Sequence, residues 1–241
     1  FIQDHILDQY GHLVTPDHIS LIHRGINCLY FDKNNVLQQD VETLKKAWDV
    51  AIDVPIILMP ARVTRWKGHE VALRALACLS HENAVLVIVG SDQGRIEYRQ
   101  ELENLSTSLG IAHRVRIVSH CDNMPAAYEA ATLVLHAATD PEAFGRVVAE
   151  AQAMGKPCVV SSLGAPREII LEDITGWISE SGNHEDYAFK INHILSLTEQ
   201  ELSAISLKAR ARVLDLFSLE KMCEKTLKVY ESMLHYEAGK G

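Results

Sequence analysis

The stretch LVLHAATDPEAFGRVVAEAQAMGKPCVVS, residues 133–161, decides the fold class. Residues 133–136 and 158–161 are short apolar runs of the kind found in buried strands. Between them, residues 145–154 have the apolar spacing of a helix, and a glycine and a proline then end it. A strand, a helix and a second apolar strand in this order predict a crossover unit of a parallel sheet.

The same alternation continues on both sides of this unit. It predicts strands over residues 56–59, 84–89, 114–118 and 177–178, and helices over residues 69–79, 95–109 and a short segment opened by Asp122, Asn123 and Pro125. Continuous apolar strands that alternate with helices are typical of a parallel sheet covered on both faces. The fold class is therefore α/β, a doubly wound parallel sheet of the Rossmann-like type, with a helical C-terminal tail.

The N-terminal residues have a different pattern. Residue 1 is Phe, residues 1–10 have helical apolar spacing with Gly11 at the C-cap position, and residues 19–23 read as a strand. Such a short amphipathic helix must bury its apolar face, and no neighbouring elements complete a sheet around the strand. We expect residues 1–30 to be the end of another domain with its linker, and residues 31–215 to be the main domain.

The C-terminal residues are helical by pattern. Thr198 and Glu201 form a predicted capping box, and a last helix runs from Ser218 to about Tyr236 within a tail over residues 216–241. Its apolar positions are Met222, Leu227, Tyr230, Met233 and Leu234. This apolar face is either partly exposed in this chain or packed on the chain's own domain.

Composition excludes several classes of protein. With 23 basic against 32 acidic residues, the net charge of −9 argues against nucleic-acid binding and against broad adhesion to anionic membranes. The longest apolar runs stay far below the roughly 18 residues of a membrane-spanning helix. Five widely spaced cysteines without a C-x-x-C pair, and histidines without metal-ligand spacing, predict a reducing cytosol, no disulfide and no metal site.

Two loops at strand ends carry candidate binding residues, because ligands of such sheets bind at the carboxyl ends of strands. Arg62 and Lys67 follow the first strand and suit a diphosphate. Residues 90–94 after the second strand are not G-x-G-x-x-G, and no P-loop motif exists, which disfavours a dinucleotide fingerprint.

The loop and helix after residue 136 carry two carboxylates. Glu142 precedes the predicted helix and Glu150 lies inside it, while the amides of Gly145, Arg146 and Val147 open the helix and attract an anionic group. A carboxylate only accepts hydrogen bonds, so sugar hydroxyls are natural partners. Because a pyrophosphate would repel it, we expect Glu150 to lie toward a ribose.

These motifs together resemble a known family. The E-x7-E pair in PEAFGRVVAEAQAMGKPCVV, with PARVTRWKGHE over residues 60–70 and GAPREI over residues 164–169, is similar to the C-terminal donor-binding domain of retaining GT-B glycosyltransferases of the family 4, or group 1, type. The resemblance runs from about Phe1 to Met233. His136 and Ala137 stand where relatives often have Pro-Ser, and Ala165 stands where they often have Gly. We expect His136 to be a strand-end histidine bonded to backbone rather than a catalytic group.

The resemblance implies a role for each matching residue. Arg62 and Lys67 would hold the donor diphosphate and neutralise the departing nucleotide, and Glu142 would contact the donor sugar at the reacting centre. These residues form the implied catalytic set. The implied donor-binding set adds the backbone amides of Phe144, Gly145 and Arg146 for the sugar and distal phosphate, Glu150 for the ribose, and Val118, Ser119 and Met124 for the base.

The implied activity is transfer of a sugar from a UDP-, GDP- or ADP-sugar with retention, without cofactor or metal, as in polysaccharide biosynthesis. A glycan or lipid-linked acceptor would bind through a missing N-terminal domain, so we expect this chain to be inactive alone. The implied location is the cytoplasm or, peripherally, the inner face of the membrane. Three alternatives remain: an NAD(P)-dependent oxidoreductase, a non-catalytic nucleotide-sugar-binding module, and a related phosphorylase or epimerase.

Overall fold

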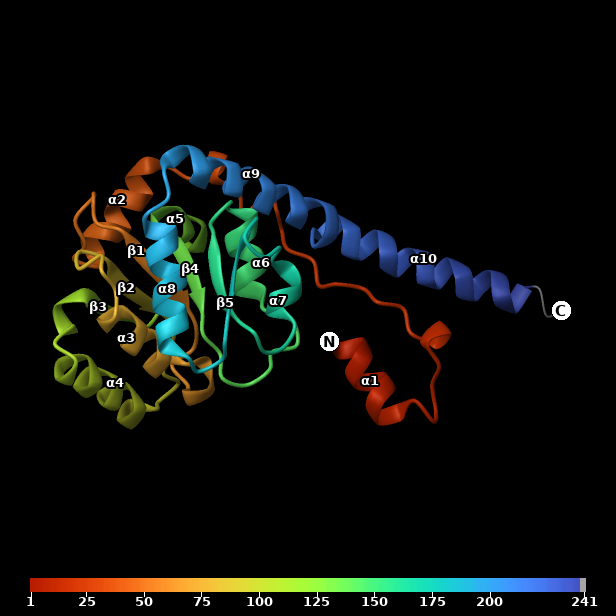
Figure 1. Cartoon of the computed structure of the whole chain (residues 1–241). Helices are drawn as coiled ribbons and strands as arrows, with labels where there is room; N and C mark the ends of the chain where they lie inside the picture. Colours follow the sequence, from red (N-terminus) through yellow and green to blue (C-terminus); the bar gives the residue numbers. More distant parts are fainter. Residues whose placement is uncertain (239–241) are drawn as a thin grey trace.

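The computed structural model describes residues 1–238 of the chain, and within them a six-stranded parallel sheet forms the centre (Figure 1). Its strands are β1 (Ile56–Pro60), β2 (Val85–Val89), β3 (Val115–Val118), β4 (Leu133–His136), β5 (Cys158–Ser161) and β6 (Gly176–Ser179), in the order β3-β2-β1-β4-β5-β6. All pairs are parallel. The predicted doubly wound α/β fold is confirmed, and the chain order reverses direction between β1 and β4.

Helices cover both faces of the sheet because its strands are apolar on both sides. One face carries α3 (His69–Ala77), α4 (Ile96–Ser108) and α8 (His184–Leu195), and the other carries α2 (Gln38–Ala47), α5 (Met124–Ala130) and α6 (Arg146–Ala153). Successive residues of β1 alternate between these layers: Ile56 and Leu58 join the α5 and α6 side, whereas Ile57 and Met59 join the α3 side. Two buried clusters result, one on each face of the sheet.

The remaining helices and turns complete the described chain. They are α1 (Ile2–Tyr10), α7 (Pro166–Ile169), α9 (Glu199–Leu216), α10 (Leu219–Ala238), and the 3-10 turns η1 (Pro16–His18), η2 (Lys33–Asn35), η3 (Arg65–Lys67) and η4 (Ala112–Arg114). The predicted capping box is confirmed at the start of α9: Thr198 accepts from the Glu201 amide, and the Glu201 carboxylate accepts from the Thr198 amide. The predicted helix to Tyr236 continues to Ala238; the last three residues of the predicted tail lie outside the described residues.

The N-terminal predictions are partly wrong. Helix α1 is present, but none of its residues is buried, and Gly11 caps it in the right-handed conformation with φ −60°. Residues 19–23 form no strand. The backbone pairs only at Ile26, whose amide donates to Phe217 at 2.8 Å and whose carbonyl accepts from Leu219 at 3.0 Å. An isolated apolar run has the composition of a strand but, without a neighbouring strand, no ladder to join.

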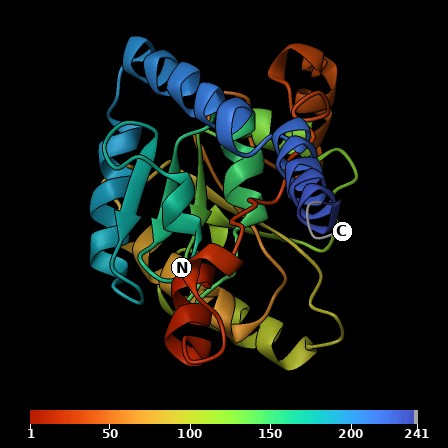
Figure 2. The same cartoon turned by 90° about the vertical axis from the view of Figure 1, so that its right-hand side faces the viewer.

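The two ends of the described chain leave the body of the molecule. Figure 2 shows α1 beside the carboxyl edge of the sheet, and Figure 1 shows α10 extending away from the sheet and its helices. Within the described residues, no helix combines the length and the apolar character needed to cross a membrane.

Candidate functional site

The loop between β1 and α3 brings its basic residues to the carboxyl edge of the sheet. Arg62 follows β1 and is exposed, and η3 ends in Gly68 with φ +75°. A Cβ at Gly68 would lie 1.8 Å from the carbonyl oxygen of Ala137, so only glycine permits this close approach of η3 to the end of β4. The approach places Lys67 beside the loop that follows β4.

The ammonium group of Lys67 has two partners. It forms an ion pair with the Glu142 carboxylate, and it lies 4.1 Å from the ring centroid of Trp66. Cation–π contact of this kind is attractive by about 0.5–1 kcal/mol or more. The Lys67 side chain is only 12% exposed, so its charge is held at the edge of the sheet and directed at the loop between β4 and α6.

Glu142 accepts from two groups at once. Its Oε1 meets Lys67, and its Oε2 meets Nε2 of His136. Burial alone would raise the pKa of this carboxyl, but the hydrogen bond from His136 and the charge of Lys67 outweigh it and lower the pKa to about 2. Glu142 is therefore a fixed negative charge.

The expectation for His136 is wrong. It is a buried strand-end residue, but its imidazole bonds the Glu142 side chain rather than a backbone group. The error has a physical reason: the loop after β4 turns back over the strand end, and this return is not visible in the spacing of the two residues.

A cavity of about 970 Å³ opens between this edge and the N-terminal segment. Six of the predicted site residues line it: Arg62, Lys67, Glu142, Phe144, Gly145 and Arg146. The opposite wall comes from residues 1–4, 6 and 19–24, which the sequence did not assign to the site. The ring of His23 in this wall packs edge-on against the ring of Phe217, with 4.9 Å between the ring centroids. The rings of Phe217 and Phe144 are also neighbours, with 6.0 Å between their centroids.

The start of α6 faces the same cavity. Gly145 is its N-cap with φ +89°, and no side chain among the described residues caps this end. The first amides of the helix, with the positive end of its dipole, are therefore directed at the cavity that Arg62 and Lys67 line. An anionic group is the ligand chemistry that this arrangement attracts.

Glu150 lies deeper, outside the lining of this cavity. Its carboxylate accepts from the Tyr128 hydroxyl at 2.9 Å and pairs with Arg146 at 3.1 Å. Burial raises the pKa of Glu150, against the influence of these two partners. Tyr128 is fully buried and was not predicted as a site residue; a tyrosine inside a short helix gives no signal in the sequence that it will bond a carboxylate on the next helix.

The three residues predicted to meet a base also lie outside that lining. Val118 ends β3, Ser119 follows it and is exposed, and Met124 begins α5. Val118 and Met124 are half-buried against the core beneath, and the Val118 carbonyl accepts from the Gly90 amide at 2.8 Å. These residues form the neighbouring part of the carboxyl edge, beyond β2.

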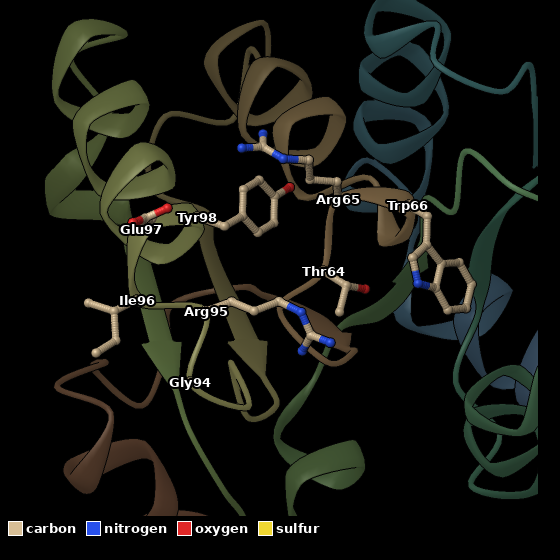
Figure 3. A pocket seen from close by; sticks show the side chains of 8 residues that line it. All are labelled: Thr64, Arg65, Trp66, Gly94, Arg95, Ile96, Glu97 and Tyr98. Atoms are coloured by element: carbon tan, nitrogen blue, oxygen red, sulfur yellow. The ribbon is translucent and has the colours of Figure 1, made fainter.

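A second cavity, of about 710 Å³, lies between η3 and the start of α4 (Figure 3). It is lined by Thr64, Arg65, Trp66, Gly94, Arg95, Ile96, Glu97 and Tyr98. Arg65 lies 4.7 Å over the Tyr98 ring and pairs with Glu101 at 2.8 Å. It is not lined by any of the residues that the sequence predicted for the site.

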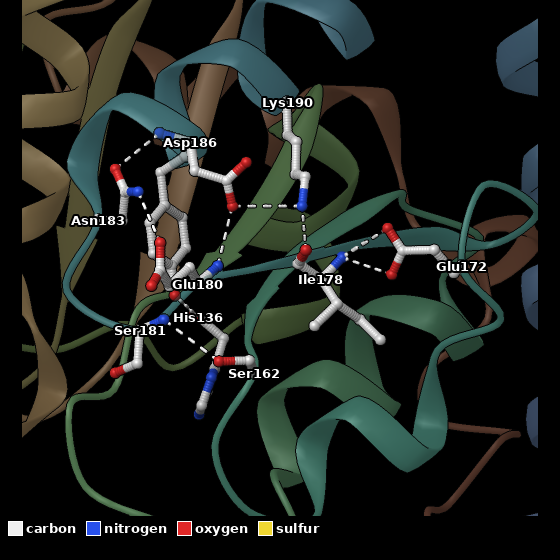
Figure 4. Close-up of polar contacts among 10 residues, drawn as sticks. His136, Ser162, Glu172, Ile178, Glu180, Ser181, Asn183, Asp186 and Lys190 are labelled. Carbon is white, nitrogen blue, oxygen red and sulfur yellow. Dashed lines mark hydrogen bonds and ion pairs between the residues drawn. The ribbon is translucent and has the colours of Figure 1, made fainter.

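Polar contacts hold the edge beside His136 (Figure 4). The Ser181 amide after β6 donates to the Ser162 hydroxyl after β5 at 3.2 Å, and the Glu180 amide donates to the Asp186 carboxylate of α8 at 2.8 Å. The Tyr187 hydroxyl donates to the backbone carbonyl of His136 at 3.4 Å. The loops after β5 and β6 are thereby tied to α8 and to the end of β4.

Comparison with known proteins gives one family. The family model described as "Glycosyl transferases group 1" matches residues 40–212. An uncharacterized glycosyltransferase of Methanocaldococcus jannaschii, MJ1607, is 32% identical over 90% of this chain and 55% of its own length. This chain thus spans little more than half the length of that curated relative.

Solved structures agree with this match. A glycosyltransferase from Rickettsia africae is 34% identical, with a TM-score of 0.93 over 97% of this chain and 61% of that one. The Anabaena protein Alr3699/HepE, crystallised in complex with UDP, is 25% identical, with a TM-score of 0.86 over 95% of this chain and 61% of its own.

Proposed function

Because this chain belongs to the glycosyl transferases of group 1, we propose that it binds a nucleotide diphosphate sugar and presents the sugar for transfer to an acceptor. More specifically, we propose the donor-binding C-terminal part of a retaining GT-B enzyme of family 4. The observation that carries the proposal is the convergence of Arg62, Lys67, Glu142 and the start of α6 on one cavity at the carboxyl edge of the sheet.

The chemistry of this cavity suits the leaving group. When the bond between the anomeric carbon and the phosphate oxygen breaks, its electron pair stays on the diphosphate and positive charge develops on the sugar. Arg62, Lys67 and the first amides of α6 would stabilise the growing negative charge, because they are positioned before the reaction begins. Glu142, fixed as a carboxylate, would face the sugar. No metal is needed for this division of charge, and we propose that none takes part.

The nucleoside would extend toward β3, with its base near Val118, Ser119 and Met124 and its ribose at Glu150. In the structure Glu150 is occupied by Tyr128 and Arg146. The Arg146 side chain is 65% exposed, and ribose binding would need this partner to turn aside from Glu150. UDP bound to the Anabaena relative makes uracil the first base to test.

The rest of the activity would need residues outside this chain. We propose that residues 1–30 end an acceptor-binding domain, that residues 31–215 bind the donor, and that residues 216–241 cross back toward the first domain. This chain covers 55% and 61% of the lengths of two relatives, so a protein of their size would have room for such a first domain. A glycan or lipid-linked acceptor, in the cytoplasm or at the inner face of the membrane, fits the family.

A thermal-shift panel tests the proposal. The chain would be melted with UDP, GDP, ADP and NAD, each with and without EDTA. A ligand at about 100 times its Kd stabilises the folded state by about 2.7 kcal/mol. We expect a shift with one nucleoside diphosphate and none with NAD. A shift with NAD alone would favour the oxidoreductase alternative, and a shift that EDTA abolishes would contradict the metal-free site.

A further inference from the structure

The backbone of His136 is fixed by the sheet. His136 is the last residue of β4, pairs in register with Val160 of β5 and is 4% exposed. The Tyr187 hydroxyl, on α8, donates a hydrogen bond to the backbone carbonyl of His136. The imidazole is therefore attached to a rigid strand, and its position does not depend on a bound ligand.

The two ring nitrogens of His136 differ in their surroundings. Nε2 meets Oε2 of Glu142, whereas Nδ1 is buried and finds no hydrogen-bond partner among the described residues. A carboxylate only accepts, so Nε2 must carry the proton. The contact with Glu142 therefore fixes Nε2 as a hydrogen-bond donor.

Glu142 is held at three points. The Ala165 amide donates to its backbone carbonyl at 2.8 Å, Lys67 meets Oε1, and His136 meets Oε2. The two side-chain partners are not equivalent. Lys67 lies on a flexible stem in a loop and lines the cavity that attracts a phosphate, whereas the ring of His136 comes from the sheet. A bound diphosphate competes for Lys67 but leaves His136 in place.

We propose that His136 is a positioning residue for Glu142, which keeps the carboxylate directed at the donor sugar once Lys67 turns to the diphosphate. The proposal rests on the proposed function, in which Glu142 faces the sugar. Without His136, the carboxylate would lose its fixed partner when Lys67 leaves, and it would rotate or follow the ammonium group. Hydrogen bonds to the sugar would then have to order a mobile acceptor.

The contact itself can be tested without ligand. Nitrogen-15 NMR of the imidazoles at neutral pH reports which ring nitrogen carries the proton. We expect His136 to be protonated at Nε2 in the wild-type chain and to change its resonances in Glu142→Ala. An Nε2 without a proton in the wild type, or His136 resonances that Glu142→Ala leaves unchanged, would overturn the proposal.

Calorimetry with UDP and UDP-glucose then tests positioning. His136→Leu should weaken UDP-glucose binding about tenfold, the scale of a hydrogen bond to a charged group, and leave UDP binding unchanged. His136→Gln, whose amide reaches the place of Nε2, should restore most of the difference. His193→Leu, the same exchange at an exposed histidine of α8 that lines neither cavity, is the matched control and should keep the wild-type ratio of the two affinities.

The outcomes separate the two proposals. Equal losses for UDP and UDP-glucose in His136→Leu, or no loss for either, would overturn the positioning role while UDP binding still supports a donor site. A wild-type chain that binds neither UDP nor UDP-glucose would contradict the proposed function. The nitrogen-15 NMR experiment alone would then test whether His136 bonds Glu142.

Discussion

Lys67 is the residue that connects the phosphate part of the site with the sugar part, because its ammonium group lines the cavity and pairs with Glu142. Lys67→Ala should weaken UDP binding about tenfold or more, since a charged partner of the diphosphate is lost. Uridine binding should hardly change. Calorimetry with both ligands measures the difference. Arg65→Ala, in the same turn but outside the lining of this cavity, is the matched control; equal losses for UDP and uridine would contradict a phosphate role.

Glu142 should make stability depend on pH at the acidic end. Its pKa is lowered from 4.5 to about 2 in the folded state, so its contribution is fully present above pH 4.5 and is lost as the pH falls toward 2. The linkage is worth about 3 kcal/mol at most. Urea unfolding of wild type and Glu142→Gln should therefore differ most near neutral pH and converge toward pH 2.

A surface pair supplies the control for this pH effect. Glu101 pairs with Arg65, and its side chain is 50% exposed, so solvent screens the pair. Glu101→Gln should change the free energy of unfolding by less than about 1 kcal/mol, both near neutral pH and toward pH 2. A constant difference between wild type and Glu142→Gln from pH 6 to pH 3 would show that Glu142 is not the group that titrates.

Sequence and structure agree at the residue scale where chemistry follows from position at a strand end. Arg62, Lys67 and Glu142 lie in the loops that follow β1 and β4, and parallel strands bring such loops to one edge. The partners of the carboxylates could not be predicted in this way. His136 reaches Glu142, and Tyr128 reaches Glu150, through the local path of a loop and the packing of two helices, which periodicity does not encode.

At the scale of elements, the start of α6 is the part of the site that backbone geometry controls. Gly145 has φ +89°, and a Cβ there would lie 2.7 Å from Cγ of Pro166 at the start of α7. Gly145→Ala should cost about 1–3 kcal/mol of stability and weaken UDP binding, because α6 must shift its first amides. Thermal unfolding and calorimetry measure the two effects.

Gly182→Ala is the matched control for that variant. Gly182 has φ +78°, but nothing lies within 4 Å of a Cβ built there. Gly182→Ala should lower the free energy of unfolding by about 1–2 kcal/mol, the cost of a left-handed backbone conformation for alanine. UDP binding should not change. If both variants lost UDP binding alike, the effect would come from general destabilisation rather than from the position of α6.

The same scale shows why the core elements were predictable and the N-terminal one was not. Strands β1 to β6 are mostly apolar, with Arg116 as the charged residue inside β3, and each strand has a neighbour to pair with. Residues 19–23 have a similar composition but no neighbouring strand, and they line the cavity instead. Strand propensity describes a fit to a sheet, and here no sheet is available.

At the scale of the whole molecule, α10 carries apolar side chains away from the core. Leu227, Tyr230, Met233 and Leu234 are 59%, 60%, 60% and 67% exposed, whereas Met222 is half-buried and accepts from the Gly25 amide at 3.2 Å. Of the two readings of this face, partial exposure is therefore confirmed, and the exposed part lies beyond Met222.

An exposed apolar stripe of this kind favours self-association of the chain. The triple variant Leu227→Gln, Tyr230→Gln, Leu234→Gln should lower the concentration-dependent rise in mass seen by sedimentation velocity, and it should leave the unfolding temperature nearly unchanged because these side chains pack on little. Lys228→Gln, on the same helix and 67% exposed, should leave the rise as it is. A mass that never depends on concentration in the wild type would mean that the stripe drives no association, whereas a large drop in unfolding temperature in the triple variant would mean that α10 packs on the body of the molecule after all.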